Sequence, residues 1–226
     1  MDNIKDILYD NQDIKYRDFH YNLLNNKDIK MIGVRTPILK KISKKLAKND
    51  YELFIKNNKH ETYEEITLEG LLIGYLKLDF NIIIKYLDNF IPYINNWATC
   101  DLTCSNLKIF KQEQIKGFNY IKKCLKNKNP WKQRVGIVLL NSHYINDDYI
   151  DEILSIINIK SNEYYVEMAL AWLISTCFIK YKDKTINFLN NNNLNDFTYN
   201  KAIQKITEST RVGKDEKEQI RKLKRF

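Results

Sequence analysis

A tryptophan and an aspartate stand four residues apart near the middle of the chain, as Trp97 and Asp101 in the stretch NNWATCDLTC. On a helix this spacing places both side chains on one face, where an aromatic ring can lie beside a carboxylate. Cys100 and Cys104 repeat the same spacing one residue out of phase. Three readings of the stretch are open: a metal site, a piece of hydrophobic core, or an active site.

The metal site is the weakest of these readings. A structural zinc ion needs about four ligands, usually from closely spaced cysteine or histidine pairs. Cys100 and Cys104 could be completed only by Cys124, Cys177 and three scattered histidines. Buried free thiols are common in helices, so we expect no metal and no cofactor. The chain also lacks the local motifs of serine nucleophile elbows and phosphate-binding loops.

The composition favours an all-α protein. The 226 residues include only 6 Gly and 3 Pro, whereas sheet proteins need frequent turns rich in both. The longest apolar runs are shorter than the roughly 18 residues that suggest a membrane span, so we expect no membrane partner. The first thirty residues carry charges throughout and show no apolar signal-peptide core. Cysteines without a disulfide-type pattern favour the reducing cytoplasm.

Positive charge is clustered as well as abundant. The net charge is +9, and a biased, lysine-rich composition explains part of that total. Residues 102–134 hold eight Lys and one Arg against the single acid Glu113, and residues 35–48 hold five Lys and one Arg with no acid. Clusters of this kind are typical of a polyanion-binding surface. In an arginine-poor chain, Arg35, Arg134 and Arg211 are candidates for bidentate phosphate contacts.

Helix start signals and apolar periods recur along the chain and predict helix pairs. The pairs should begin near residues 37, 61, 92, 130, 161 and 196, a spacing typical of helical-pair repeats. We therefore expect one HEAT-like helical-repeat domain over residues 1–226, a solenoid capped at its start by one or two helices. The inner helix of each pair would line a concave basic groove. The segment 164–180 is apolar nearly all round and should be a buried helix.

Four stretches together resemble the DNA alkylation repair family of HEAT-like-repeat DNA glycosylases, the AlkD type. They are MIGVRTPILKKISKKL, NNWATCDLTC, WKQRVGIVLL and YYVEMALAWLISTC, and they extend over nearly the whole chain. The resemblance implies an α-helical solenoid whose groove binds duplex DNA. It also implies hydrolysis of the N-glycosidic bond of cationic N-alkylated purines, of the 3-methyladenine and 7-methylguanine type. We expect the protein to act as a monomer.

The resemblance also implies residue roles. The family's catalytic Asp falls on Asp101, its two lesion-contacting tryptophans fall on Trp97 and Trp172, and its DNA-backbone Arg falls on Arg134. The remaining DNA-binding candidates from the charge clusters are Arg35, Lys40, Lys44 and Lys132. Lys201, Lys205 and Arg211 lie outside the clusters and are candidates to extend the DNA groove. The family often has a Tyr a few residues before the Gly of GVRTP. In this chain the equivalent position falls near Leu24, and Tyr21 is a shifted candidate to replace it.

These side chains suit the implied chemistry. A purine alkylated at N3 or N7 is already cationic and leaves without a general acid, so one carboxylate can both stabilise the developing sugar cation and position water. Tryptophan faces attract cations by about 0.5–2 kcal/mol. Two rivals stay open: a catalytically silent protein that binds damaged or branched DNA, and a helical-repeat scaffold for a protein partner. The sequence alone does not separate them.

Overall fold

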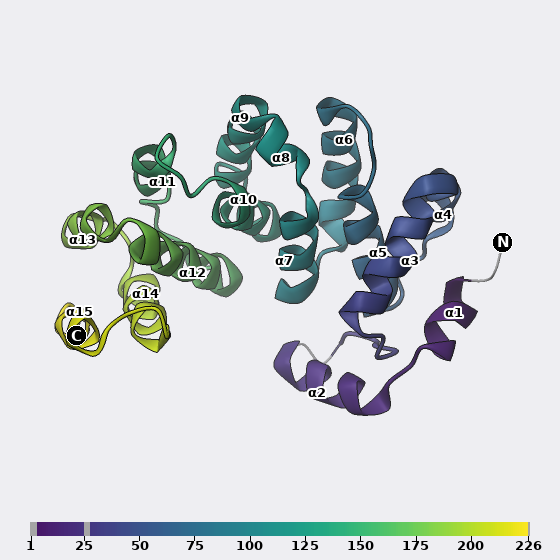
Figure 1. Ribbon diagram of the computed structural model, residues 1–226, viewed down its shortest axis with the longest axis horizontal. Coiled ribbons are helices and arrows are strands. Elements are labelled where there is room, and N and C mark those ends of the chain that lie inside the picture. The colour runs from purple at the N-terminus through teal and green to yellow at the C-terminus, as the bar shows by residue number, and fades with distance from the viewer. Residues whose placement is uncertain (1–3, 25–27, 226) are drawn as a thin grey trace. The chain divides into compact units, whose positions relative to one another are not determined.

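The computed structural model describes residues 4–24 and 28–225, and in these residues the regular elements are helices (Figure 1). The one β-type contact described is an isolated bridge between Gln12 and Val34. The predicted all-α class is confirmed. The chain forms two compact units, Met1–Ile109 and Phe110–Phe226. The expected single domain over residues 1–226 stays a prediction.

The first unit begins with two helices that precede the pairs, as expected, α1 (Ile4–Asp10) and α2 (Ile14–Leu24). The helices that follow are α3 (Thr36–Asn49), α4 (Tyr51–Asn57), α5 (Tyr63–Ile73), α6 (Phe80–Phe90), the 3₁₀ turn η1 (Ile91–Tyr93) and α7 (Trp97–Asn106). The short helix α8 (Ile109–Gln112) spans the boundary between the units.

The second unit is also built from consecutive helices. Its elements are α9 (Gln114–Leu125), α10 (Pro130–His143), α11 (Ile150–Ile156), α12 (Tyr164–Lys180), α13 (Lys182–Asn190), α14 (Asp196–Glu208) and α15 (Lys214–Arg221). The predicted pair starts correspond to α3, α5, α7, α10, α12 and α14. The largest error is at Pro92, which lies in η1, while α7 begins five residues later at Trp97.

The first helices of successive pairs pack side by side within each unit. In the first unit α5 lies between α3 and α7, and in the second α12 lies between α10 and α14. Every residue of α5 is buried, which fits a helix enclosed on all sides. The predicted burial of the segment 164–180 is confirmed, because α12 is buried apart from a narrow strip. The solenoid with a basic groove stays an expectation.

Candidate functional site

Helix α7 is held tightly on α5 in the first unit. A side chain at Gly70 on α5 would clash with Thr103 on α7, so the two backbones approach closely at this point. The hydroxyls of Thr67 and Thr99 share a buried hydrogen bond of 3.0 Å. At the other end of α7, Asn106 Nδ2 donates to the Leu71 carbonyl oxygen at 2.7 Å. These contacts fix which face of α7 is turned away from α5.

The start of α7 is fixed by Asn96, whose side chain is completely buried. Its Oδ1 accepts a hydrogen bond from the backbone N–H of Thr99 at 2.8 Å, and its Nδ2 donates to Thr99 Oγ1 at 3.0 Å. Asparagine at the N-cap satisfies an otherwise unpaired backbone donor. Sequence reasoning missed this role, although an Asn directly before Trp97 was a usable signal for the helix start.

Trp97 and Asp101 lie one turn apart on the less buried face of α7, as their spacing predicts. Ala98, Thr99 and Cys100 between them are buried, whereas both site side chains are partly exposed. The Trp97 ring packs against the hydrophobic core of the first unit, and its Nε1 donates to the Leu23 carbonyl oxygen at 3.4 Å. The indole is therefore held by core packing and by one hydrogen bond, and Asp101 lies one turn further along the same face.

Leu24, near which the resemblance places the family's Tyr, is a core residue in this chain. Leu24, the last residue of α2, is fully buried among the residues against which Trp97 packs. Tyr21 lies one turn earlier on α2 and is partly exposed. Leu24 is therefore one member of the hydrophobic cluster on which the indole packs.

A buried carboxylate that the sequence did not reveal organises the loop before α3. Glu64 is completely buried and accepts three backbone hydrogen bonds, from Ile32 at 2.9 Å, Gly33 at 2.7 Å and Val34 at 3.1 Å. Gly33 has φ of 102°, and a Cβ there would lie 2.6 Å from Arg17 Cβ. The pairing spans about thirty residues of sequence, so no local pattern could have predicted it.

Arg35 follows this loop and is engaged within the first unit. Its Nε and Nη2 donate to Asp13 Oδ2 at 2.9 and 2.7 Å, and its guanidinium lies 5.0 Å from the ring centre of Tyr16. The backbone N–H of Tyr16, together with Arg35, lowers the pKa of the Asp13 carboxyl. Two of the donors that would form a phosphate fork are thus directed at a carboxylate. The DNA-binding role of Arg35 stays a prediction.

The cationic surface of α3 is divided between two sides of the helix. Lys40 and Lys44 are exposed, and Lys44 Nζ lies 5.3 Å from the ring centre of Tyr75, which follows α5. Lys41 and Lys45 lie about 100° further round the helix, beside α1. The lysines of α3 therefore form two rows with different neighbours.

Arg134 is buried on α10 of the second unit, with 4% of its surface exposed. Its Nη1 donates to the Tyr165 carbonyl oxygen in the first turn of α12 at 2.6 Å. The Tyr165 ring in turn stacks on Trp131, with 4.7 Å between ring centres. These contacts fix α12 against α10. Lys132 is partly exposed, with Nζ 5.8 Å from the ring centre of Tyr120. Phosphate contacts by Arg134 and Lys132 stay predictions.

Trp172 is the most exposed residue of the central part of α12, at 37%. The residues directly before and after it, Ala171 and Leu173, are completely buried. Its carbonyl oxygen accepts hydrogen bonds from Ser175 Oγ at 2.8 Å and Thr176 Oγ1 at 3.1 Å. A large ring is therefore presented to solvent by a helix that is otherwise core, an arrangement that suits a contact surface.

The last three basic candidates lie on and after α14. Lys201 is partly exposed, donates to Gln204 Oε1 at 3.0 Å and lies 5.8 Å from the ring centre of Phe197. Lys205 is one turn further along the same helix and is also partly exposed. Arg211 is exposed in the loop that follows α14. Lys201 and Lys205 therefore share one face of α14, and their contact with DNA stays a prediction.

The cysteines behave as core residues. Cys100, Cys104, Cys124 and Cys177 are free thiols and completely buried. Burial raises the pKa of the Cys177 thiol to about 12, so it remains protonated at neutral pH. In the described part of the chain, no group of three or more His, Cys, Asp or Glu side chains is placed to hold a metal ion.

One comparison with known proteins identifies a relationship. A family model described as DNA alkylation repair enzyme matches residues 9–206, which extend from the end of α1 to within the last turn of α14. No curated protein matches the chain. Within residues 4–24 and 28–225, every helix is too short or too polar to cross a membrane.

Proposed function

The chain belongs to the DNA alkylation repair enzyme family, and we propose that it is a DNA glycosylase for cationic N-alkylated purines in duplex DNA. The observation that carries the proposal is the pair of Trp97 and Asp101 on one partly exposed face of α7. An aromatic ring and a carboxylate at this spacing are the two groups that a cationic nucleotide and a sugar cation require.

Asp101 is the proposed catalytic group. The alkylated base carries its positive charge before the bond breaks, so the barrier lies in the oxocarbenium-like sugar and in the attack of water. A carboxylate beside C1′ stabilises that charge and orients or deprotonates the water molecule. Most glycoside hydrolases use two carboxyl groups because their leaving group needs a proton. Here the leaving group needs none.

Trp97 is the proposed neighbour of the lesion. Its ring is anchored on the core and through Nε1, so its face is held in place rather than ordered on binding. Such preorganisation lowers the entropy cost of binding. The ring attracts a cationic base or sugar by about 0.5–2 kcal/mol. Trp172 is assigned to the lesion by the family resemblance, and its exposure on α12 is compatible with that role.

A second function is favoured by Leu24. The family's Tyr falls near this buried leucine by resemblance, and without that Tyr the lesion would lack one of the neighbours that the family supplies. A member of this kind could bind damaged or branched DNA without excising a base. The protein-binding scaffold is separated from both by salt, since DNA binding falls steeply as salt rises. A monomeric state and a cytoplasmic location stay predictions.

The decisive experiment measures release of 7-methylguanine from a defined duplex by the native protein and by Asp101→Asn. We expect an abasic site with the native protein and a loss of about 100-fold or more with Asp101→Asn, the scale of lost electrostatic stabilisation in active sites. Asp79→Asn is a matched control, because Asp79 is exposed and its side chain makes no cap bond.

Two results would count against this function. Base release that is equal in the native protein and Asp101→Asn would remove Asp101 from the chemistry. Tight duplex binding by both proteins with no base release would leave recognition without catalysis as the function. Binding should be measured in the same samples, so that loss of affinity is not mistaken for loss of chemistry.

A further inference from the structure

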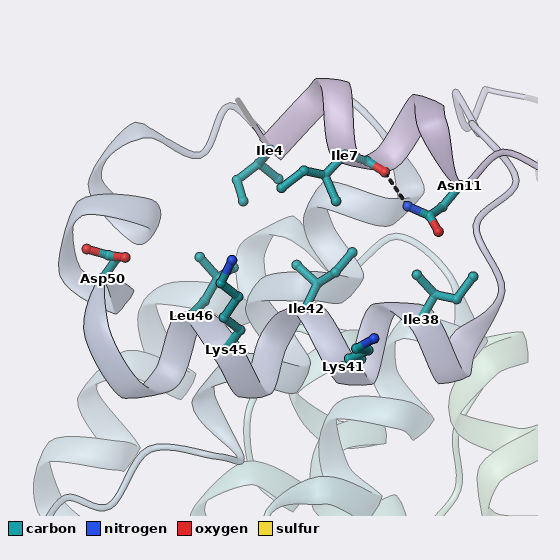
Figure 2. Close-up of a pocket in the computed structure, with 9 residues that line it drawn as sticks. All are labelled: Ile4, Ile7, Asn11, Ile38, Lys41, Ile42, Lys45, Leu46 and Asp50. Atoms are coloured by element: carbon teal, nitrogen blue, oxygen red, sulfur yellow. Dashed lines mark hydrogen bonds between the residues drawn. The ribbon is translucent and has the colours of Figure 1, made fainter. Parts of the chain in front are cut away.

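An apolar groove lies between α1 and α3, at a place separate from Trp97 and Asp101. It encloses about 640 Å³, which is within the range of ligand-binding sites. Its apolar walls are Ile4 and Ile7 from α1 and Ile38, Ile42 and Leu46 from α3. Figure 2 shows these side chains pointing toward one another across the space between the two helices.

The rim of the groove is positively charged on one side. Lys41 and Lys45 line it from α3, four residues apart and exposed. In the described part of the chain, neither lysine forms an ion pair or a side-chain hydrogen bond. Helix α3 carries no acidic residue to neutralise them. The polar ends are Asn11, which donates to the Ile7 carbonyl oxygen at 2.8 Å, and Asp50.

We propose that this groove binds an acidic amphipathic helix of a partner protein. Ile38, Ile42 and Leu46 form a row at intervals of four residues, and at 1.5 Å per residue the row is about 12 Å long. That length matches about two turns of an incoming helix, whose apolar side chains would occupy the groove. Lys41 and Lys45 repeat the same interval, so they suit two acidic side chains one turn apart.

Charge complementarity decides between this occupant and others. A phosphate backbone would contact lysines but would leave the isoleucine walls uncovered. A second copy of the chain, with a net charge of +9, would bring like charges together. A fatty acid has a single carboxylate, so it could pair with one of the two lysines but not with both. Ile4 and Ile7, which form the α1 wall, lie before residues 9–206, the range that the family model matches. This wall of the groove is therefore outside the part of the chain that is shared with the family.

The test uses three synthetic 16-residue peptides and the full chain. All three have the same composition of apolar residues, but the first carries Glu on its polar face, the second Lys, and the third Glu with the apolar positions scrambled. Fluorescence anisotropy should show saturable binding of the first peptide alone. Hydrogen exchange should then slow in α1 and α3, whose amides the peptide covers.

Matched charge reversals locate the contact. We expect Lys41→Glu with Lys45→Glu to lower the affinity for the acidic peptide about tenfold or more, the scale of unfavourable like-charge contacts at an interface. Lys40→Glu with Lys44→Glu makes the same charge change on the other side of α3 and should weaken it about threefold at most. All four lysines are exposed, so both proteins should keep their fold, which circular dichroism checks.

Three outcomes would overturn the proposal. The acidic peptide could bind no better than the scrambled one, or both charge reversals could weaken it equally. Changes at Lys41 and Lys45 could instead abolish duplex binding, which would make the groove part of a DNA interface. The proposal does not depend on glycosylase activity, since a chain that releases no base could still bind the peptide. Failure of one proposal therefore leaves the other standing.

Discussion

Replacing Glu64 tests whether a single buried carboxylate holds the loop before α3. Its oxygens accept from the backbone N–H groups of Ile32, Gly33 and Val34 at 2.7–3.1 Å, and none of its surface is exposed. Glu64→Ala leaves three buried donors without this acceptor, and each orphaned donor costs about 1–3 kcal/mol. Because water can enter part of the space, we expect a loss of about 3–5 kcal/mol.

A graded series makes this prediction sharper. Glu64→Gln keeps one accepting oxygen but turns an NH₂ group toward a backbone donor, so about 2–3 kcal/mol should be lost. Glu52→Gln is the control, because Glu52 is exposed on α4 and its carboxylate accepts a hydrogen bond from the neighbouring Tyr51 hydroxyl. Exposed changes of this kind stay within about 0.5 kcal/mol.

Urea unfolding followed by circular dichroism is the assay, with thermal unfolding as a second reading. For a chain of this size each kcal/mol lowers Tm by about 2–4 °C, so Glu64→Ala should unfold roughly 10 °C lower. Because the chain forms two compact units, the urea curves must first be shown to follow a single unfolding transition. A loss below about 1 kcal/mol in Glu64→Ala would refute the reasoning, because three buried donors would then have found other partners.

Three further changes test the loop, a half-buried histidine and the basic face of α14. Gly33→Ala should cost about 1–3 kcal/mol in urea unfolding, because φ is 102° and a Cβ would meet the Asp13 carbonyl oxygen at 2.7 Å; an unchanged midpoint would contradict this. Burial lowers the pKa of His20 from 6.5, so the unfolded chain takes up a proton first and native stability should fall as pH drops below about 6.5. His20→Phe should fall less over the same pH range, and parallel curves would exclude His20 as the cause. Lys201→Ala with Lys205→Ala should make the salt dependence of duplex binding shallower by about one unit of slope for each phosphate that a lysine no longer neutralises, whereas an unchanged slope would remove both from the interface.

The local features of this protein could be predicted well because their causes are local. Scarce Gly and Pro indicate helices, and apolar periods of about 3.6 residues locate the first helices of the pairs near their observed starts. The spacing of Trp97 and Asp101 is sufficient to place both on one face, since helix geometry alone sets that relation. The continuous apolar run at 164–180 likewise predicts a buried α12.

The partners of individual polar side chains were decided only by tertiary structure. Arg35 looks like a phosphate fork in sequence, but folding brings Asp13 within 2.7 Å of it from 22 residues away. The resemblance assigns Arg134 to the DNA backbone and gives no protein partner for it, and only the fold shows that α12 packs over α10 and buries it on a backbone carbonyl. Such pairings depend on which helices become neighbours, and a one-dimensional pattern does not contain that information.

The amino-acid sequence by itself therefore determined the helical class, the order of the pairs and the face on which Trp97 and Asp101 lie. Tertiary structure decided how that face is supported, through Gly70 on α5 and Asn96 at the start of α7, and how the loop before α3 is held, through Glu64. The physical reason is the sequence separation over which each kind of interaction acts. Helix propensity and side-chain spacing act within a few residues, whereas burial and hydrogen-bond satisfaction join residues tens of positions apart.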